Sequence, residues 1–429
     1  MNMPQNLILM CTVGGSHQPI VKAITELSPD FVYFFCTDKD PATGKPGSIR
    51  QIEGKGSVIE EKSTDGTVKK LPSIPVQTGL KEAQYRAVIV PPDDLDDAFN
   101  IMHKALNEAK TDHPGSQIIM DYTGGTKTMT AALAITALEE DNVELQLVSG
   151  ARADLLKVVQ GTESSTEANV EGIRLRRKMA PFLSAWQWYG YGVAYNGISN
   201  IHRPKNRNLQ APWQIARDLS EAFDAWDRFD HQTALSRISA YRQRLGAKFG
   251  KQIKFLEILN AEKKDAKHGA ACLWDLWHNA QRRAEQNRFD DAVARIYRLL
   301  EWTAQWLLEQ KNINTSDLSP DILPAHINAT ENRSGKWQLG LFGAWELVAE
   351  LFDKTTKDFA NNERAKMQNY LKKRNYSILA HGNKPVSKTD WEEFSSWLEQ
   401  ALIPVLKHES EKVGFRLETQ QLPTSPVWE

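Results

Sequence analysis

Apolar runs alternate with amphipathic stretches over the first 150 residues. Apolar runs of strand length occupy residues 6–13, 30–37, 85–92, 117–124 and 143–150. Between them, residues 17–28, 93–110 and 127–141 place their apolar side chains at helical spacing. Alternation of helices with continuously apolar strands is typical of a parallel, doubly wound sheet. We therefore predict an α/β N-terminal domain with a Rossmann-like parallel sheet.

The pattern changes to one helix after another from about residue 171. Segments with helical period include 220–245, 291–310 and 363–382. All 13 tryptophans lie at Trp186 or later, which supports a change of fold rather than one continuous domain. We therefore predict an all-α C-terminal region, and we expect its tryptophan-rich stretch at 274–306 to lie in the core.

Four further segments have simpler interpretations. Residues 38–84 are polar and rich in Gly, Lys and Ser, which favours a long insertion that could form a mobile hairpin. The basic cluster RLRRK (174–178) is typical of a solvated face. His17, at the start of a helix, is expected to be exposed. The polar tail at 417–429 is expected to be loosely held.

Composition narrows the class of protein. The chain of 429 residues is 41% apolar and 25% charged, as in ordinary globular proteins, and its net charge of −1 gives no global attraction to nucleic acid. Cys11, Cys36 and Cys272 are scattered without a C-x-x-C pair, which argues against disulfides or zinc and fits a reducing cytoplasm. We expect no signal peptide and no membrane span, because no basic leader or bilayer-length apolar run is present.

Two glycine-rich loops follow predicted strands and open predicted helices: TVGGSH (12–17) and YTGGTKT (122–128). Ligands of open α/β sheets bind beyond the carboxyl ends of the strands, and free N–H groups at helix starts favour anions. Neither the G-x-G-x-x-G fingerprint nor the P-loop pattern fits. One such loop alone would favour a simple tight turn, but two on one sheet edge favour a phosphate-bearing ligand. Lys127 and the loop hydroxyls could contact it.

The segment RNYSILAHG (374–382) ends a predicted helix. Seven helical residues turn through about 700°, so Arg374 and His381 would project from one face with Ser377 between them. A permanent cation beside a group that titrates near neutrality suits work on phosphate. The alternative is a basic helix end, with His381 as a C-terminal cap before Gly382.

RNYSILAHG resembles the R-x(4–6)-H motif of HEPN ribonucleases, which implies RNA cleavage without a metal, and the chemistry of this pair is compatible with that reaction. It needs a base that helps a ribose 2′-OH attack its neighbouring phosphate, an acid for the leaving 5′-oxygen and a cation for the developing charge. The attack would give a 2′,3′-cyclic phosphate. One motif supplies one His and one Arg, so a two-fold dimer would supply two of each. Metal-ligand spacings such as H-E-x-x-H are absent from the sequence.

The loops and the C-terminal motif together resemble a known family. MDYTGGTKTM (120–129), with the VGGS loop (13–16), resembles the ligand-sensing CARF domain of CRISPR-associated proteins. RNYSILAHG resembles the R-x(4–6)-H motif of HEPN ribonucleases, with the polar Asn375 directly after the arginine. ARIYRLLEWTAQ (294–305) is similar to the helix that opens the HEPN part in one branch. The order of these parts along the chain, with the CARF-like part first, a helical region next and the HEPN-like part last, is similar to that of the ancillary ribonucleases of type III CRISPR systems.

The resemblance implies a CARF-like ligand-sensing domain at 1–165, a helical linker domain at 171–270 and a HEPN ribonuclease domain at 271–429. It implies a homodimer that binds a cyclic oligoadenylate between its CARF domains. Binding would activate the HEPN motifs to cleave single-stranded RNA in cytoplasmic antiviral defence. Apart from this allosteric activator, no cofactor and no metal are expected.

The resemblance also assigns residues. Arg374 and His381 would be catalytic, supported by Asn375. The ligand cleft would be lined by the following residues: Thr12, Gly14, Gly15, Ser16, Thr123, Gly124, Gly125, Thr126 and Lys127.

Other functions stay open at this point. The chain could be a catalytically inactive cyclic-nucleotide sensor whose helical half docks partners. Its CARF domain could also cleave its own activator. A conventional Rossmann dehydrogenase is disfavoured because its glycine fingerprint is missing. The sequence predicts neither the ring size of the activator nor the RNA sequence preference.

Overall fold

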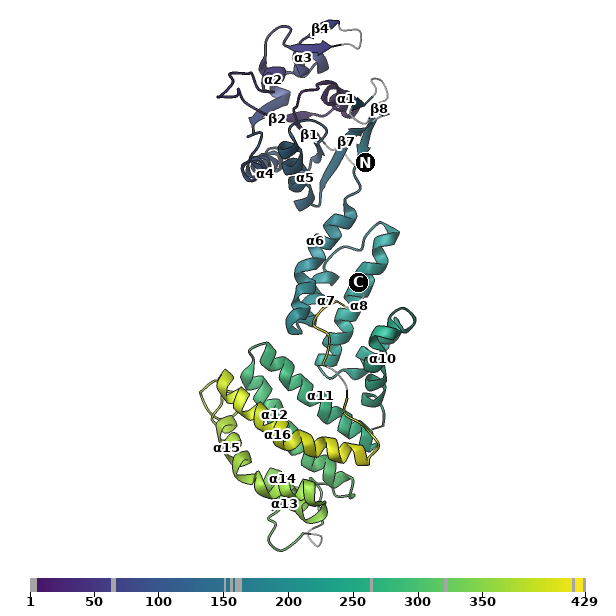
Figure 1. Ribbon diagram of the computed structural model, residues 1–429, viewed down its shortest axis with the longest axis vertical. Coiled ribbons are helices and arrows are strands. Elements are labelled where there is room, and N and C mark those ends of the chain that lie inside the picture. Colours follow the sequence, from purple (N-terminus) through teal and green to yellow (C-terminus); the bar gives the residue numbers. More distant parts are fainter. Residues whose placement is uncertain are drawn as a thin grey trace. The chain divides into compact units, whose positions relative to one another are not determined.

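The computed structural model describes residues 6–62, 67–149, 152–154, 157–158, 164–262, 265–319, 323–418 and 421–426 (Figure 1). The chain forms two compact units, Met1–Arg177 and Lys178–Glu429. The first contains the α/β sheet and the second is mainly helical, which confirms the predicted fold class.

A six-stranded sheet forms the centre of the first unit, in the order β10-β7-β6-β1-β2-β5. All neighbours are parallel except β10, which runs antiparallel to β7. The strands are β1 (Leu7–Thr12), β2 (Phe31–Cys36), β5 (Tyr85–Ile89), β6 (Gln117–Asp121), β7 (Val143–Ser149) and β10 (Ser164–Glu167). Two short strands, β8 (Arg152–Asp154) and β9 (Lys157–Val158), pair with each other.

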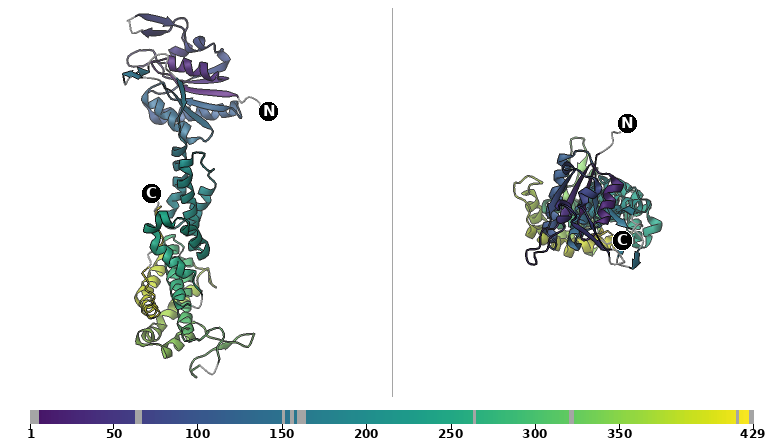
Figure 2. Two further views of the ribbon diagram at one scale, coloured as in Figure 1. Left: turned by 90° about the vertical axis from the view of Figure 1, so that its right-hand side faces the viewer. Right: turned by 90° about the horizontal axis from the view of Figure 1, so that it is seen from above.

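Helices cover both faces of this sheet, as Figure 2 shows. Along β1, Ile8 joins the core under α4 (Leu95–Asp112) and α5 (Lys127–Glu139), whereas Leu9 joins the core under α1 (Gln18–Leu27). Successive side chains of a strand point to opposite faces. A strand buried on both faces therefore has the continuous apolar run seen in the sequence.

The insertion at 38–84 folds into short elements beside the sheet. It contains α2 (Arg50–Glu53), the antiparallel hairpin of β3 (Ile59–Lys62) and β4 (Val68–Leu71), α3 (Ile74–Thr78) and a 3₁₀ turn η1 (Glu82–Gln84). The predicted hairpin is therefore present. Ile52, Ile59 and Ile74 are buried in the core beneath α1, so the insertion is anchored by apolar side chains.

The helices after the sheet are α6 (Glu171–Ser184), α7 (Tyr191–Ser199), α8 (Arg207–Asp227), α9 (His231–Ser239), α10 (Arg242–Leu259), α11 (Ala266–Glu285), α12 (Phe289–Glu309), α13 (Leu341–Leu351), α14 (Lys354–Asn362), α15 (Arg364–Asn375) and α16 (Lys388–Lys412). A 3₁₀ turn η2 (Ala185–Trp188) and a hairpin of β11 (Thr330–Glu331) and β12 (Trp337–Gln338) complete the chain. Within the described residues, no helix is long and apolar enough to cross a membrane.

Tryptophans fill the core of the helical unit. Helices α11, α12 and α16 pack side by side (Figure 1). Trp274, Trp277 and Trp306 are buried among them, which confirms that the tryptophan-rich stretch is core.

The expectation of a loose C-terminal tail is wrong for its described residues. Arg282, itself only 1% exposed, donates from Nη1 to Gln421 Oε1 across 2.6 Å. Leu422 is buried, and the Tyr191 hydroxyl donates to the Pro423 carbonyl oxygen at 2.7 Å. The polar composition of the tail concealed this attachment, because its polar groups bond to protein rather than to water.

The basic cluster at 174–178 is also more than a solvated face. Arg174 donates from Nη2 to the carbonyl oxygens of Ala137 and Val143, at 2.7 and 2.6 Å. These carbonyls belong to α5 and β7, so the arginine fastens the start of α6 to the sheet domain. Burial lowers the pKa of the Arg174 guanidinium.

Candidate functional site

The two glycine loops meet at one edge of the sheet. They follow β1 and β6, which are parallel neighbours. The strand order runs from β1 through β2 to β5 on one side and from β6 to β7 on the other. The loops therefore lie at the point where the order reverses, where open α/β sheets bind their ligands.

Glycine is required because the loops touch through their backbones. A Cβ at Gly14 would lie 2.5 Å from the Gly125 nitrogen, and one at Gly124 would lie 2.4 Å from the Thr12 carbonyl oxygen. Gly125 has φ of +88°, a conformation that L side chains rarely adopt. The Thr12 hydroxyl donates to the Gly124 carbonyl oxygen at 2.6 Å and locks the two loops together.

The structure divides the predicted ligand residues into two groups. Thr12 is fully buried, Thr123 Oγ1 accepts from the Val148 N–H at 2.7 Å, and Thr126 Oγ1 accepts from the Met129 N–H as the cap of α5. These hydroxyls hold the loops in place. Gly15, Ser16 and Lys127 are instead exposed, and nothing lies within 4 Å of a Cβ built at Gly15. A ligand would meet this exposed group first.

Residues of the insertion support the first loop, and no sequence pattern predicted this contact. Gln51 Nε2 donates to the Gly14 carbonyl oxygen at 2.6 Å, and Gln18 Nε2 donates to Glu61 Oε1 at 2.5 Å. His17 is only 5% exposed, so the expectation of an exposed histidine is wrong. Burial lowers its pKa, and the nearby Glu61 carboxylate opposes this.

The motif RNYSILAHG does not form one helix, which corrects the geometry expected from its spacing. Helix α15 ends at Asn375, and Ser377–Gly382 forms a tight loop. The His381 N–H donates to the Asn375 carbonyl oxygen at 3.2 Å, so the chain folds back on the helix end. A Cβ at Gly382 would lie 1.8 Å from the Tyr376 carbonyl oxygen, a clash that only glycine avoids.

The three predicted catalytic residues lie together at this helix end. Arg374 is half-buried, with its guanidinium over the ring of Tyr297 at 4.7 Å and with Nη1 donating to Asn375 Oδ1 at 3.2 Å. Asn375 and His381 are exposed. The stack on Tyr297 orients the planar cation, and the histidine stays accessible to a substrate.

A pocket of about 670 Å³ opens beside the motif. Tyr370, Lys373 and Arg374 of α15 form one wall, residues 382–386 form another, and Asp390 and Phe394 of α16 help to close it. Lys373 donates to Asp390 and Glu393 at 2.8 and 2.9 Å and ties the end of α15 to the start of α16. The volume suits a ligand of nucleotide size.

The loop also exposes apolar side chains. Tyr376 is 71% exposed, Ile378 60% and Leu379 53%. Three large apolar side chains exposed within four residues are unusual for a surface and are typical of a contact with another protein.

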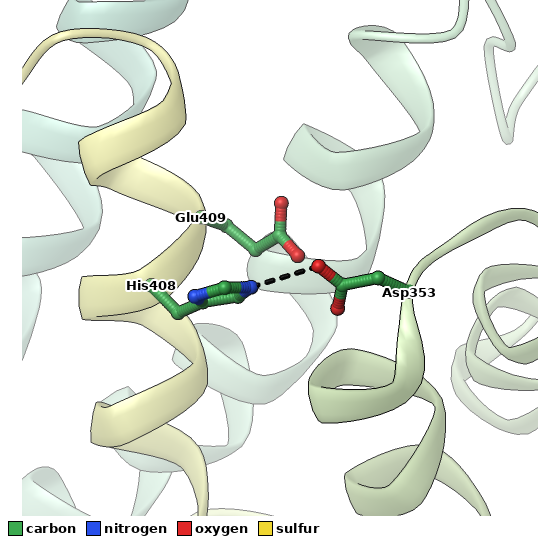
Figure 3. A group of neighbouring side chains, drawn as sticks. All are labelled: Asp353, His408 and Glu409. Atoms are coloured by element: carbon green, nitrogen blue, oxygen red, sulfur yellow. Dashed lines mark hydrogen bonds and ion pairs between the residues drawn. The ribbon is translucent and has the colours of Figure 1, made fainter.

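One cluster in the described part of the chain has the spacing of metal ligands, namely Asp353, His408 and Glu409 (Figure 3). His408 Nε2 lies 2.8 Å from Asp353 Oδ2, but Lys412 Nζ also lies 2.7 Å from Asp353 Oδ2 and 2.8 Å from Glu409 Oε1. Lys412 and His408 hold the pKa of Asp353 well below its usual range. The ammonium thus already supplies the cation that these carboxylates need.

Comparisons with known proteins agree with this description. Residues 261–403 match the family model of the Csm6 HEPN domain. No match was found among curated proteins. Among solved structures, the chain is similar to Enterococcus italicus Csm6 bound to cyclic hexa-2'-fluoro-hexa-dAMP, with 13% identity, a TM-score of 0.55 and coverage of 95% of this chain and 98% of that one. The HEPN match and this shared fold confirm the predicted resemblance to the CARF–HEPN proteins of type III CRISPR systems, with residues 261–403 matching the Csm6 HEPN domain.

Proposed function

We propose that the chain is an endoribonuclease that cleaves single-stranded RNA without a metal ion, as a homodimer activated by a cyclic oligoadenylate. The observation that carries the proposal is the loop that returns His381 to the end of α15, beside Arg374 and Asn375. A group able to transfer protons therefore lies in a loop that closes on the helix end with a permanent cation, and Arg374 and Gly382 of this segment line the nucleotide-sized pocket, which supports the proposal.

The reaction needs only groups of this kind. A histidine draws the proton from the ribose 2′-OH while the oxygen attacks the adjacent phosphorus. Arg374 binds the phosphate oxygens as negative charge develops. The bond between phosphorus and the 5′-oxygen breaks, and a second group donates a proton to this leaving oxygen. A 2′,3′-cyclic phosphate remains on the other fragment. Asn375, which accepts a hydrogen bond from Arg374, keeps the guanidinium in position.

A dimer supplies the second proton donor. One motif holds one histidine, so base and acid come from two copies of His381 if the motifs meet on a two-fold axis. The exposed side chains of Tyr376, Ile378 and Leu379 belong to the motif loop itself and support contact between two copies there.

The glycine loops support the choice of activator. They meet at the switch point of the sheet, where the exposed Gly15, Ser16 and Lys127 can contact phosphate groups. The similar Csm6 from Enterococcus italicus is bound to a cyclic hexa-adenylate analogue. A cyclic oligoadenylate therefore fits this edge in both chemistry and position.

The proposal is tested with a quenched fluorescent RNA in buffer that contains EDTA. The full chain is assayed alone, with cyclic tetra-adenylate and with cyclic hexa-adenylate. We expect cleavage that requires one ring, survives EDTA and falls by roughly a hundredfold or more in His381→Ala. His326→Ala, which removes another exposed histidine of the same unit, serves as the matched control. Activator binding without cleavage would refute the nuclease and leave a sensor.

A further inference from the structure

The pocket beside the motif has the composition of a nucleobase site. Tyr370 and Phe394 both line it, and their rings are stacked at 4.3 Å with planes 3° apart. Stacked on each other, the two rings add aromatic surface to the lining of the pocket, and Pro385 and Val386 add apolar surface. Proteins that read single-stranded RNA hold unstacked bases against such aromatic and apolar walls.

Of the four charged residues that line the pocket, Lys373 and Asp390 are paired with each other. Lys373 donates to the Asp390 and Glu393 carboxylates, and Asp390 also accepts from the Ser387 hydroxyl at 2.6 Å. The exposed Asn383 also lines the pocket, and its side-chain amide has both a donor and an acceptor. Such an amide can pair with two neighbouring atoms on the edge of a base.

The pocket also adjoins the segment that is proposed to bind the phosphate of the cleaved bond. Arg374 and Gly382 both line it, and they flank the loop that holds His381. A phosphate bound between Arg374 and His381 would therefore leave the base of an adjoining nucleotide at the mouth of the pocket. The walls are fixed, since the Val386 N–H donates to Asp290 Oδ2 at 3.0 Å and Lys373 ties α15 to α16.

We propose that this pocket is a base-selecting subsite, in which Asn383 reads the edge of the nucleobase next to the cleaved bond. The inference rests on the proposed function for the position of the phosphate. Asn383 is a specificity-determining residue here and takes no part in bond breaking.

The test measures binding, so that it does not depend on cleavage. Full-length His381→Ala protein is titrated, by fluorescence anisotropy, into a labelled oligouridine and into versions with a single central adenosine, cytidine or guanosine. We expect one base to be preferred by roughly tenfold. Adding Asn383→Ala should equalise the four affinities, Asn383→Gln should keep part of the preference, and Asn369→Ala, which removes an exposed asparagine of α15 outside the pocket, should leave it intact.

The outcomes separate the two proposals. Three results would overturn the subsite. The first is equal affinity for all four bases in the protein that retains Asn383, the second is a base preference that survives Asn383→Ala, and the third is absence of RNA binding. A preference that depends on Asn383, together with no RNA cleavage by the otherwise unmodified chain with either ring, would keep the subsite and refute the nuclease.

Discussion

The N–H of His381 donates to the carbonyl oxygen of Asn375 across 3.2 Å, so two residues six positions apart are joined through the backbone at the end of α15. The backbone of His381 is thereby returned to the helix end that carries Arg374 by a closed loop rather than by two turns of helix. This closure depends on Gly382, whose amide also donates to the Ser377 carbonyl oxygen at 3.1 Å.

Gly382→Ala should open this loop and abolish RNA cleavage while the helical fold persists. Its Cβ would lie 1.8 Å from a backbone oxygen, so the loop must move, at a cost of about 1–3 kcal/mol. Circular dichroism and thermal unfolding would report the fold, and the quenched RNA assay the activity. Gly246→Ala is the control, because nothing lies within 4 Å of a Cβ there. Wild-type cleavage by Gly382→Ala would show that the loop geometry is unimportant.

The end of α15 also shows where sequence patterns stop being informative. Ile378 and Leu379 continue the apolar period of the preceding helix, yet both are exposed. A helical pattern predicts a helix only when its apolar face is buried against something, and here the chain turns away. The parallel sheet was predictable for the opposite reason, because strands such as Leu7–Thr12 are buried on both faces and nothing competes with that assignment.

Contacts between residues far apart in the sequence are the second feature that the sequence did not predict. Gln51 supports the first glycine loop from a polar insertion whose sequence has no strong period. Gln421 likewise bonds to the buried Arg282 from a tail that is mostly polar. Each contact joins residues more than 30 positions apart, and such pairs are fixed by the tertiary fold, which one sequence does not reveal. The residues of the two glycine loops are neighbours as predicted, but their ligand-binding role stays a prediction, as does the catalytic role of Arg374, Asn375 and His381.

Arg374→Lys should lower the rate of RNA cleavage at least tenfold while RNA binding changes less. Lysine keeps the charge but loses the planar fork that grips two phosphate oxygens and the stack on Tyr297, which is 4.7 Å from the guanidinium. Single-turnover rates at saturating activator would measure the effect. Arg298→Lys is the matched control, because the Arg298 guanidinium also stacks on an aromatic ring, that of Trp302, at 5.1 Å. Equal losses in both variants would mean that Arg374 has only a structural role.

Lys127→Ala should weaken binding of the cyclic oligoadenylate by roughly tenfold, the loss of about 1.4 kcal/mol that is typical of one charge-assisted contact to phosphate. The residue is exposed at the first position of α5, where the N–H groups of the helix already favour an anion. Calorimetric titration would give the affinity, and cleavage at saturating activator should be unchanged. Lys104→Ala on α4 controls for the lost charge. Unaltered affinity would remove Lys127 from the ligand site.

His17 should make the sheet domain less stable in mild acid. Burial lowers its pKa below the ordinary value of 6.5, so the unfolded chain binds the proton more readily than the folded one. Its stabilising contribution is complete above pH 6.5 and is lost as the pH falls from there towards the folded pKa. Denaturant unfolding of wild type and His17→Gln between pH 8 and pH 5 would measure this. The variant should show a flatter dependence of the free energy of unfolding on pH. Parallel profiles for wild type and His17→Gln would contradict the assignment.

Lys412→Met should destabilise the helical unit and create an affinity for divalent cations that the wild type lacks. Glu409 is 1% exposed and bonds to Lys412 Nζ at 2.8 Å, so loss of the ammonium leaves a buried carboxylate short of a partner, at about 1–3 kcal/mol. Asp353 would lose its bond to the same nitrogen, and the space between the two carboxylates and His408 would then suit Mn²⁺ or Zn²⁺. Thermal unfolding with and without each ion would show the shift, with Lys407→Met, an exposed lysine of the same helix, as control. A cation-dependent rise in the Tm of the wild type would instead mean that Lys412 moves aside and that the cluster in Figure 3 is a metal site in the natural sequence.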